Sequence, residues 1–205
     1  MNQSHRLGCN PSIIAIVLLA LCLIACSPKY DWRDVAGQRA PYTILMPDKP
    51  SRLSREIQLG QQTVTMHMTA TQIDGIKFAV GAIKMPDAVK AQAAMALIKS
   101  ALLKNIEGTI SQEKISAANV SGKLSLSEEF NAFNPRTSIR MSGRIVARDG
   151  WVFEVLVVGP EHAIDRDIVD MFFSSFKPGN LSDLGSAAAK TPERSIFHRL
   201  FWSIS

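Results

Sequence analysis

The stretch that decides the fold is TSIRMSGRIVARDGWVFEVLVV, residues 137–158. Apolar and polar side chains alternate from Ile139 to Arg148, which is typical of a strand with one buried face. Asp149-Gly150 is a residue pair that favours a tight two-residue hairpin turn. The residues after that turn, 151–158, are almost uniformly apolar, as in a central strand. The stretch therefore predicts a long antiparallel hairpin in the middle of a sheet.

The same patterns extend outward from this hairpin in both directions. Further strands are expected at residues 42–46, 56–59, 63–73, 76–80, 109–116 and 123–133. A second Asp-Gly pair, Asp74-Gly75, predicts another hairpin. A long helix is expected from Ala88 to Ile106, with Asp87 as its N-cap and Gly108 at its end. A closing helix is expected at about 163–176. This order predicts one α+β domain over 41–178, an antiparallel sheet with helices packed on it.

Several of these segments together resemble a known family. The chain has a proline-limited first strand, YTILMP (42–47), a meander of strands, a long mid-chain helix, a DG hairpin, and the closing segment DMFFSSFKP (170–178). This combination resembles the Mog1/PsbP-like fold. The resemblance implies a binding or assembly-assisting protein, because that family consists mostly of such proteins. It offers no shared catalytic site to carry over to this chain.

The N-terminus predicts export and lipid attachment. Residues 13–25, IIAIVLLALCLIA, form an apolar run that is too short for a comfortable membrane span and is typical of a signal peptide. Leu23-Ile24-Ala25-Cys26 resembles the bacterial lipobox, which implies cleavage of residues 1–25 and acylation of Cys26. Ser27 after the cysteine favours sorting to the outer membrane, facing the periplasm. The alternative is an ordinary signal or an uncleaved anchor with an incidental cysteine.

Two segments flank the expected domain. Residues 26–40 are interpreted as a tether, whose Tyr30 and Trp32 lie at the lipid headgroups or fold back onto the domain. Residues 179–205 are interpreted as a polar linker with a short amphipathic tail. If the tail is helical, its apolar side chains share one arc; they are Ile196, Phe197, Leu200, Phe201 and Ile204. Three interpretations of the tail stay open: it packs onto its own domain, lies in the membrane interface or binds a groove of a partner.

The sequence predicts no catalytic residue, metal site or cofactor. The chain has 205 residues, and its three cysteines all lie within the first 26. It contains no G-x-S-x-G, no H-E-x-x-H and no glycine-rich phosphate loop. Met66-His67-Met68 contains possible copper ligands, but on a strand the two methionines share one face and His67 takes the other. Core methionines with an exposed histidine are therefore the favoured interpretation.

The arginines of the decisive stretch form the main candidate binding surface. Arg136, Arg140, Arg144 and Arg148 recur every four residues, a spacing that places them on one face of a strand. Such a basic stripe is either a solubilising outer face or a docking surface for an acidic partner, anionic headgroups or a cell-wall polymer. Nucleic acid is not expected as a partner, because export places the protein in another compartment.

These features together predict a non-enzymatic lipoprotein of the bacterial cell envelope. We expect it to be held at the membrane by its N-terminal lipid and to bind, or help assemble, an unidentified protein or envelope partner. The alternative is an enzyme or small-ligand carrier that uses a pocket between sheet and helix.

Overall fold

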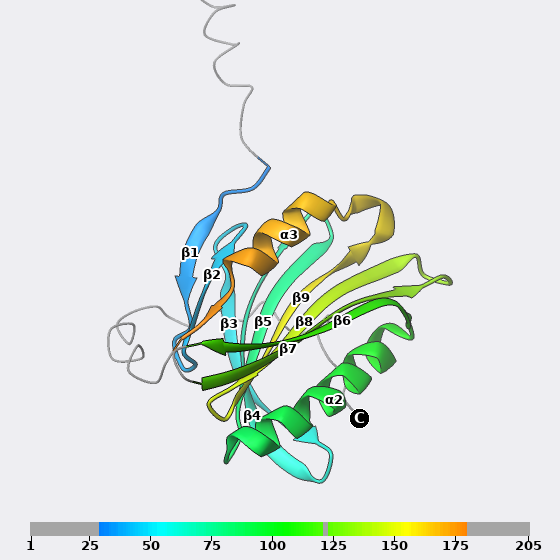
Figure 1. Cartoon of the computed structure of the whole chain (residues 1–205). Coiled ribbons are helices and arrows are strands. Elements are labelled where there is room, and N and C mark those ends of the chain that lie inside the picture. The colour runs from blue at the N-terminus through cyan, green and yellow to red at the C-terminus, as the bar shows by residue number, and fades with distance from the viewer. Residues whose placement is uncertain (1–28, 121–122, 180–205) are drawn as a thin grey trace, which may run out of the picture. The chain divides into compact units, whose positions relative to one another are not determined.

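The computed structural model describes residues 29–120 and 123–179. The described helices and strands all belong to a compact unit that begins at Asp31. It contains a seven-stranded antiparallel sheet in the order β3-β4-β5-β9-β8-β7-β6 and a three-stranded sheet in the order β1-β2-β10 (Figure 1). The large sheet comprises β3 (Ser51–Leu59), β4 (Gln62–Ile73), β5 (Ile76–Lys84), β6 (Thr109–Val120), β7 (Lys123–Asn134), β8 (Ile139–Arg148) and β9 (Trp151–Pro160).

The two Asp-Gly pairs form the tight turns that their residue types predict. Asp74 and Gly75 have φ angles of 48° and 81°, and Asp149 and Gly150 have φ angles of 51° and 73°. Positive φ at both central positions gives the turn a twist that matches the flanking strands. The turns join β4 to β5 and β8 to β9, so both predicted hairpins are confirmed.

Helix α2 (Ala88–Ile106) packs on one face of the large sheet. Its N-terminus is capped by Asp87, whose side chain accepts a hydrogen bond from the Lys90 amide at 2.7 Å. Its C-terminus ends in a left-handed residue, Glu107, followed by Gly108. The helix residues buried against the sheet are Ala91, Ala94, Met95, Ile98 and Leu102. The helix thus has the bounds that the sequence predicts, and its buried side chains form the core between α2 and the large sheet.

The opposite face of the large sheet carries helix α3 (Arg166–Ser175) and the small sheet of β1 (Arg33–Ala36), β2 (Tyr42–Met46) and β10 (Lys177–Pro178). Aromatic side chains form this second core: the Phe78 and Phe172 rings lie 5.3 Å apart, centroid to centroid. The Tyr42 hydroxyl donates to Thr69 Oγ1 at 2.8 Å and joins the two sheets. Because Tyr42 is buried, its pKa rises to about 12.

The predicted architecture of an antiparallel sheet with helices packed on it is confirmed, with differences at the edges. Strand β1 lies within residues 26–40, expected to be a tether, and pairs with β2, so the fold begins before Pro41. Only Val35 of this strand is buried, so its sequence lacks the alternation of apolar and polar residues that would predict a strand. The closing helix starts at Arg166 rather than near 163. The Asp165 side chain accepts a hydrogen bond from the Asp167 amide and so forms the N-cap of the helix. No helix of the described residues is long and apolar enough to cross a membrane.

Candidate binding cleft

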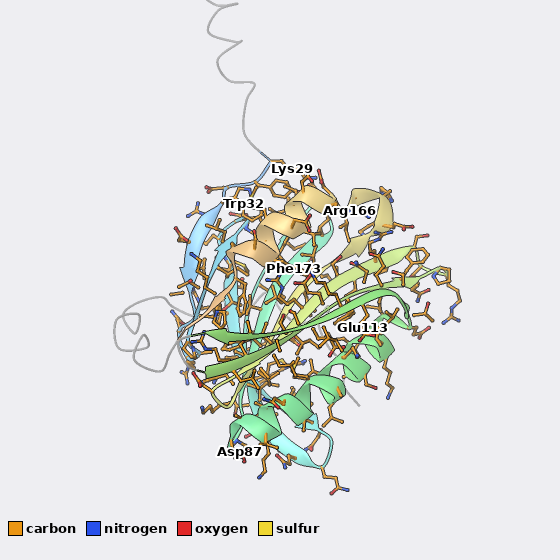
Figure 2. The ribbon with its side chains drawn as sticks, in the orientation of Figure 1. Lys29, Trp32, Asp87, Glu113, Arg166 and Phe173 are labelled. Atoms are coloured by element: carbon orange, nitrogen blue, oxygen red, sulfur yellow. The ribbon has the colours of Figure 1, made fainter. Side chains whose placement is uncertain are left out.

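An open cleft of about 570 Å³ lies between α3 and strands β6 to β8. The three strands form its floor and α3 forms its wall; Arg166 and Phe173 of α3 are labelled in Figure 2. Helix α3 packs over β5 through the Phe78–Phe172 contact and reaches β8, where Arg144 donates to the Phe173 carbonyl. The same face of β6 and β7 therefore remains open beside the helix.

The floor of the cleft carries a row of polar side chains across the three strands. Ser142 Oγ donates to Asn131 Oδ1 at 2.7 Å, and Asn131 Nδ2 donates to Gln112 Oε1 at 3.3 Å. The strand register places these residues opposite one another, Gln112 with Asn131 and Asn131 with Ser142. The floor therefore presents amide and hydroxyl groups, which hydrogen-bond to extended backbone or to hydroxyl-rich ligands.

Two arginines of the predicted stripe hold the elements around the cleft in place. Arg144 Nε donates to Glu129 Oε1 at 2.9 Å, and its Nη1 donates to the Phe173 carbonyl at 2.6 Å. Its guanidinium carbon lies 5.2 Å from the Phe173 ring centroid. Arg140 forms an ion pair with Glu161, just before α3. These contacts fasten the helix wall to the strand floor.

Two other cations of the cleft are available to a ligand. Lys114 on β6 and Arg166 at the start of α3 are exposed and line the cleft from its floor and its wall. Within the described residues neither side chain has an ion-pair partner. Three carboxylates also line the cleft; they are Asp170, one helical turn after Arg166, and Glu113 and Glu129. The cleft therefore combines a polar floor with two cations on opposite sides.

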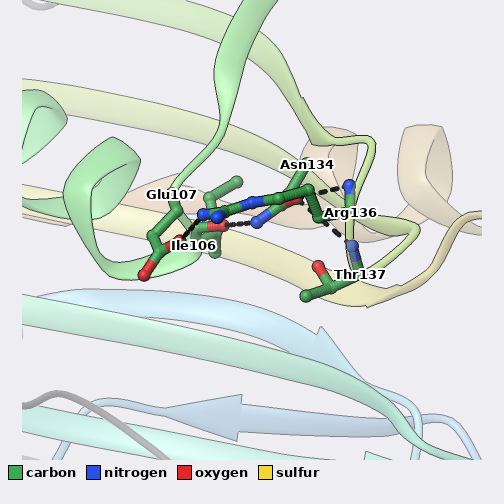
Figure 3. A network of polar contacts seen from close by, with 5 residues as sticks. All are labelled: Ile106, Glu107, Asn134, Arg136 and Thr137. Carbon is green, nitrogen blue, oxygen red and sulfur yellow. Dashed lines mark hydrogen bonds and ion pairs between the residues drawn. The ribbon is translucent and has the colours of Figure 1, made fainter.

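The expected basic stripe differs from what the structure shows. Arg136 lies in the turn before β8, where it pairs with Glu107 while the Asn134 side chain donates to the Ile106 carbonyl (Figure 3). The other three arginines do share one strand face, as predicted, but α3 and β10 cover much of it. Arg148 is 6% exposed, and its Nη1 donates to the Pro178 carbonyl. The prediction of one continuous exposed stripe is therefore wrong.

The remaining sequence candidates lie where their alternation predicts. Met66 and Met68 are buried in the core beneath α2. His67 takes the opposite face, with its Nδ1 2.8 Å from Ser54 Oγ, and partial burial lowers its pKa. No group of three His, Cys, Asp or Glu residues in the described ranges is placed to hold a metal ion. Cys26 lies outside these ranges.

Sequence reasoning missed a charged cluster on the α2 side of the sheet. Lys99 of α2 donates to Glu113 at 2.6 Å and also to Glu128. These hydrogen bonds raise the pKa of Lys99, and burial raises the pKa of Glu128. Glu128 and Glu129 are neighbours on β7, so strand alternation points them to opposite faces, and they pair with Lys99 and Arg144 respectively. The sequence signal for the cluster is weak because its partners are 14 to 29 residues apart.

Comparison with solved structures gives a likeness at the level of the fold. No protein-family model and no curated protein matches the chain. Among solved structures, the chain is similar to the solution structure of cyanobacterial PsbP (CyanoP) from Synechocystis sp. PCC 6803. The two share 11% sequence identity and a TM-score of 0.49 over 75% of this chain and 95% of that chain.

Proposed function

We propose that the protein is a lipid-anchored envelope protein that binds an anionic segment of a partner in the cleft beside α3, without catalysis. The observation that carries this proposal is the pair Lys114 and Arg166, which flank a polar floor and have no ion-pair partner in the described residues. Cations on opposite sides of one cleft favour a ligand with separated negative charges. The lipobox-like sequence at Cys26 supports the anchor, and the outer membrane is the proposed location.

The cleft is suited to a segment that lies along it. The polar row of Gln112, Asn131 and Ser142 supplies hydrogen-bonding groups across three strands, while one cation lies on the floor and the other on the helix wall. Arg140 and Arg144 form ion pairs with Glu161 and Glu129. They therefore stabilise the cleft, and their charges are already neutralised before a ligand binds. We therefore propose an extended acidic polypeptide segment as the ligand.

Reversing the two available charges is expected to weaken binding of an acidic peptide. We would titrate detergent-solubilised full-length protein into a fluorescein-labelled peptide of ten glutamates and follow its anisotropy. The double variant Lys114→Glu, Arg166→Glu is expected to raise Kd by at least about tenfold, because two attractive contacts become repulsive. The matched control, Lys49→Glu with Lys90→Glu, changes exposed lysines that do not line the cleft and should bind as wild type does. Equal affinity in all three proteins would contradict the proposal.

The proposed anchor is tested by removing the thiol that would carry the lipid. Cys26→Ser is expected to abolish incorporation of an alkyne-tagged palmitate, because the thioether to the lipid forms through that sulfur. Cys22→Ser is the matched control and should retain the label, since bulky Leu21 precedes Cys22. In-gel fluorescence after coupling the tag to a dye measures both. Equal labelling of wild type and Cys26→Ser would remove the anchor from the proposal.

The size of the cleft also favours a second candidate, a carrier for a small ligand. A volume of about 570 Å³ lies within the range of small-molecule sites. Native mass spectrometry of the full-length protein would then show a co-purified small molecule. That mass should be lost from Ser142→Phe, which fills the floor, and its absence from the wild-type protein would exclude this candidate.

A further inference from the structure

An apolar patch lies on the α2-facing side of the β6–β7 hairpin. It consists of Ile115, Ala117, Leu124 and Leu126, which we name the hairpin patch. The register places Ala117 opposite Leu126, and strand alternation puts the other two on the same face. Ile115 and Leu124 are 65% and 56% exposed, whereas Leu126 packs against the core beneath α2. The core beneath α2 therefore continues into an exposed apolar patch that no described residue covers.

Carboxylates stand at one border of the hairpin patch. Glu128 pairs with Ile115 across the two strands, and Glu113 precedes Ile115 on the same face. Both carboxylates bind the single ammonium group of Lys99. An apolar segment that carries cations would match this surface, with its apolar side chains on the patch and its cations toward the acidic border.

The chain itself continues from a point near this hairpin. The Gly179 amide donates to the Pro41 carbonyl at 2.8 Å, and the Pro178 carbonyl accepts from Arg148. Arg148 pairs in register with Ser125, the neighbour of Leu124. The last described residue is therefore close to the end of the hairpin that bears the patch, but on the opposite face of the sheet, so the following residues have to pass around the end of the hairpin to reach the patch. Residues 180–193 precede the tail, and fourteen extended residues span about 45 Å.

We propose that residues 194–204 of the same chain dock on the hairpin patch. The segment carries the apolar arc expected from its sequence, and it carries Arg194 and Arg199 to match the acidic border. Eleven residues are too few to hold a helix alone in water, so a supporting surface is needed. The covalent linker keeps the tail at a high effective concentration near the patch, which favours this occupant over a second copy or another protein.

Photo-crosslinking in the full-length protein tests this docking. Benzoylphenylalanine replaces Leu124, cells are illuminated, and tryptic peptides of the purified protein are identified by mass spectrometry. Trypsin releases the tail as peptides 195–199 and 200–205, because Arg194 and Arg199 precede them. We expect a product of monomer mass in which one of these peptides is joined to residue 124. The exposed side chain at Leu124 tolerates the probe, and Ile115 provides a second position.

Two matched variants separate docking from random collision. Benzoylphenylalanine at Leu97, an exposed apolar residue of α2 outside the patch, should give no tail peptide. Leu200→Glu with Phe201→Glu should reduce the yield from position 124 by about tenfold, since carboxylates do not bury on an apolar surface. Crosslinking of position 124 to lipid, to another protein or to a second copy at dimer mass, without the intramolecular product, would overturn the proposal.

Discussion

Replacing Glu154 by glutamine is expected to remove most of the fall in the free energy of unfolding between pH 5 and pH 8. Glu154 lies on β9 opposite Gly81 and Ile145, faces the core beneath α2 and is 2% exposed. Neither carboxylate oxygen has a hydrogen-bond partner among the described residues. Burial therefore raises the pKa of Glu154 to about 8, and the charge of Arg55 only partly opposes this rise.

The sign of the pH effect follows from the two pKa values. In the unfolded chain a glutamate loses its proton near pH 4.5, whereas the folded protein keeps this proton up to about pH 8. Between these values the unfolded state binds fewer protons, so stability falls as pH rises, by up to about 1.4 kcal/mol per pH unit. Below pH 4.5 both states are protonated, and the contribution of this group is constant.

Urea unfolding at pH 5, 6, 7 and 8 measures this effect. Glu154→Gln keeps the shape of the side chain and removes its titration, so its stability should change little across this window. Glu56→Gln is the matched control: Glu56 is exposed on β3, so the variant retains the buried carboxyl and the wild-type slope. A Glu154→Gln protein as pH-sensitive as wild type would contradict the assignment.

Local sequence rules were sufficient for the elements whose causes are local. The Asp-Gly turns, the Asp87 cap and the alternation of β8 involve residues within a few positions of one another. Strand β1 was not predicted because its partner β2 supplies the pairing, and its own four residues bury only one side chain. Glu154 was passed over because it sits within an almost uniformly apolar run.

The candidate site depends on contacts that no local pattern encodes. Spacing placed Arg140, Arg144 and Arg148 on one strand face, which is observed, but it did not indicate that α3 and β10 would cover that face. Lys114 and Arg166 are 52 positions apart in the sequence, and the fold brings them to one cleft. Tertiary packing therefore decides which cations hold the fold and which are available to a ligand.

Gly143→Ala is expected to destabilise the protein by about 1–3 kcal/mol, the usual cost of forcing an additional group into a packed core. Gly143 lies on β8 directly opposite Phe130 of β7, and its φ angle is not positive, so the backbone accepts alanine. The added Cβ would lie 2.5 Å from Phe130 Cζ and 2.7 Å from Cε1, because the ring covers the glycine. Phe130 is 2% exposed in the core beneath α2, so its ring has little room to move.

The collision with the ring is separated from other effects of Gly143→Ala by a double-mutant cycle with Phe130→Leu. Leucine at position 130 lacks the ring atoms that the new Cβ meets, so alanine at 143 should cost much less in that background. Urea unfolding of the wild type, both single variants and the double variant gives the coupling energy. Strictly additive losses would show that the Phe130 ring is not the obstacle. A double variant less destabilised than the sum of the single variants would establish that this strand pair requires glycine because an aromatic ring lies across it.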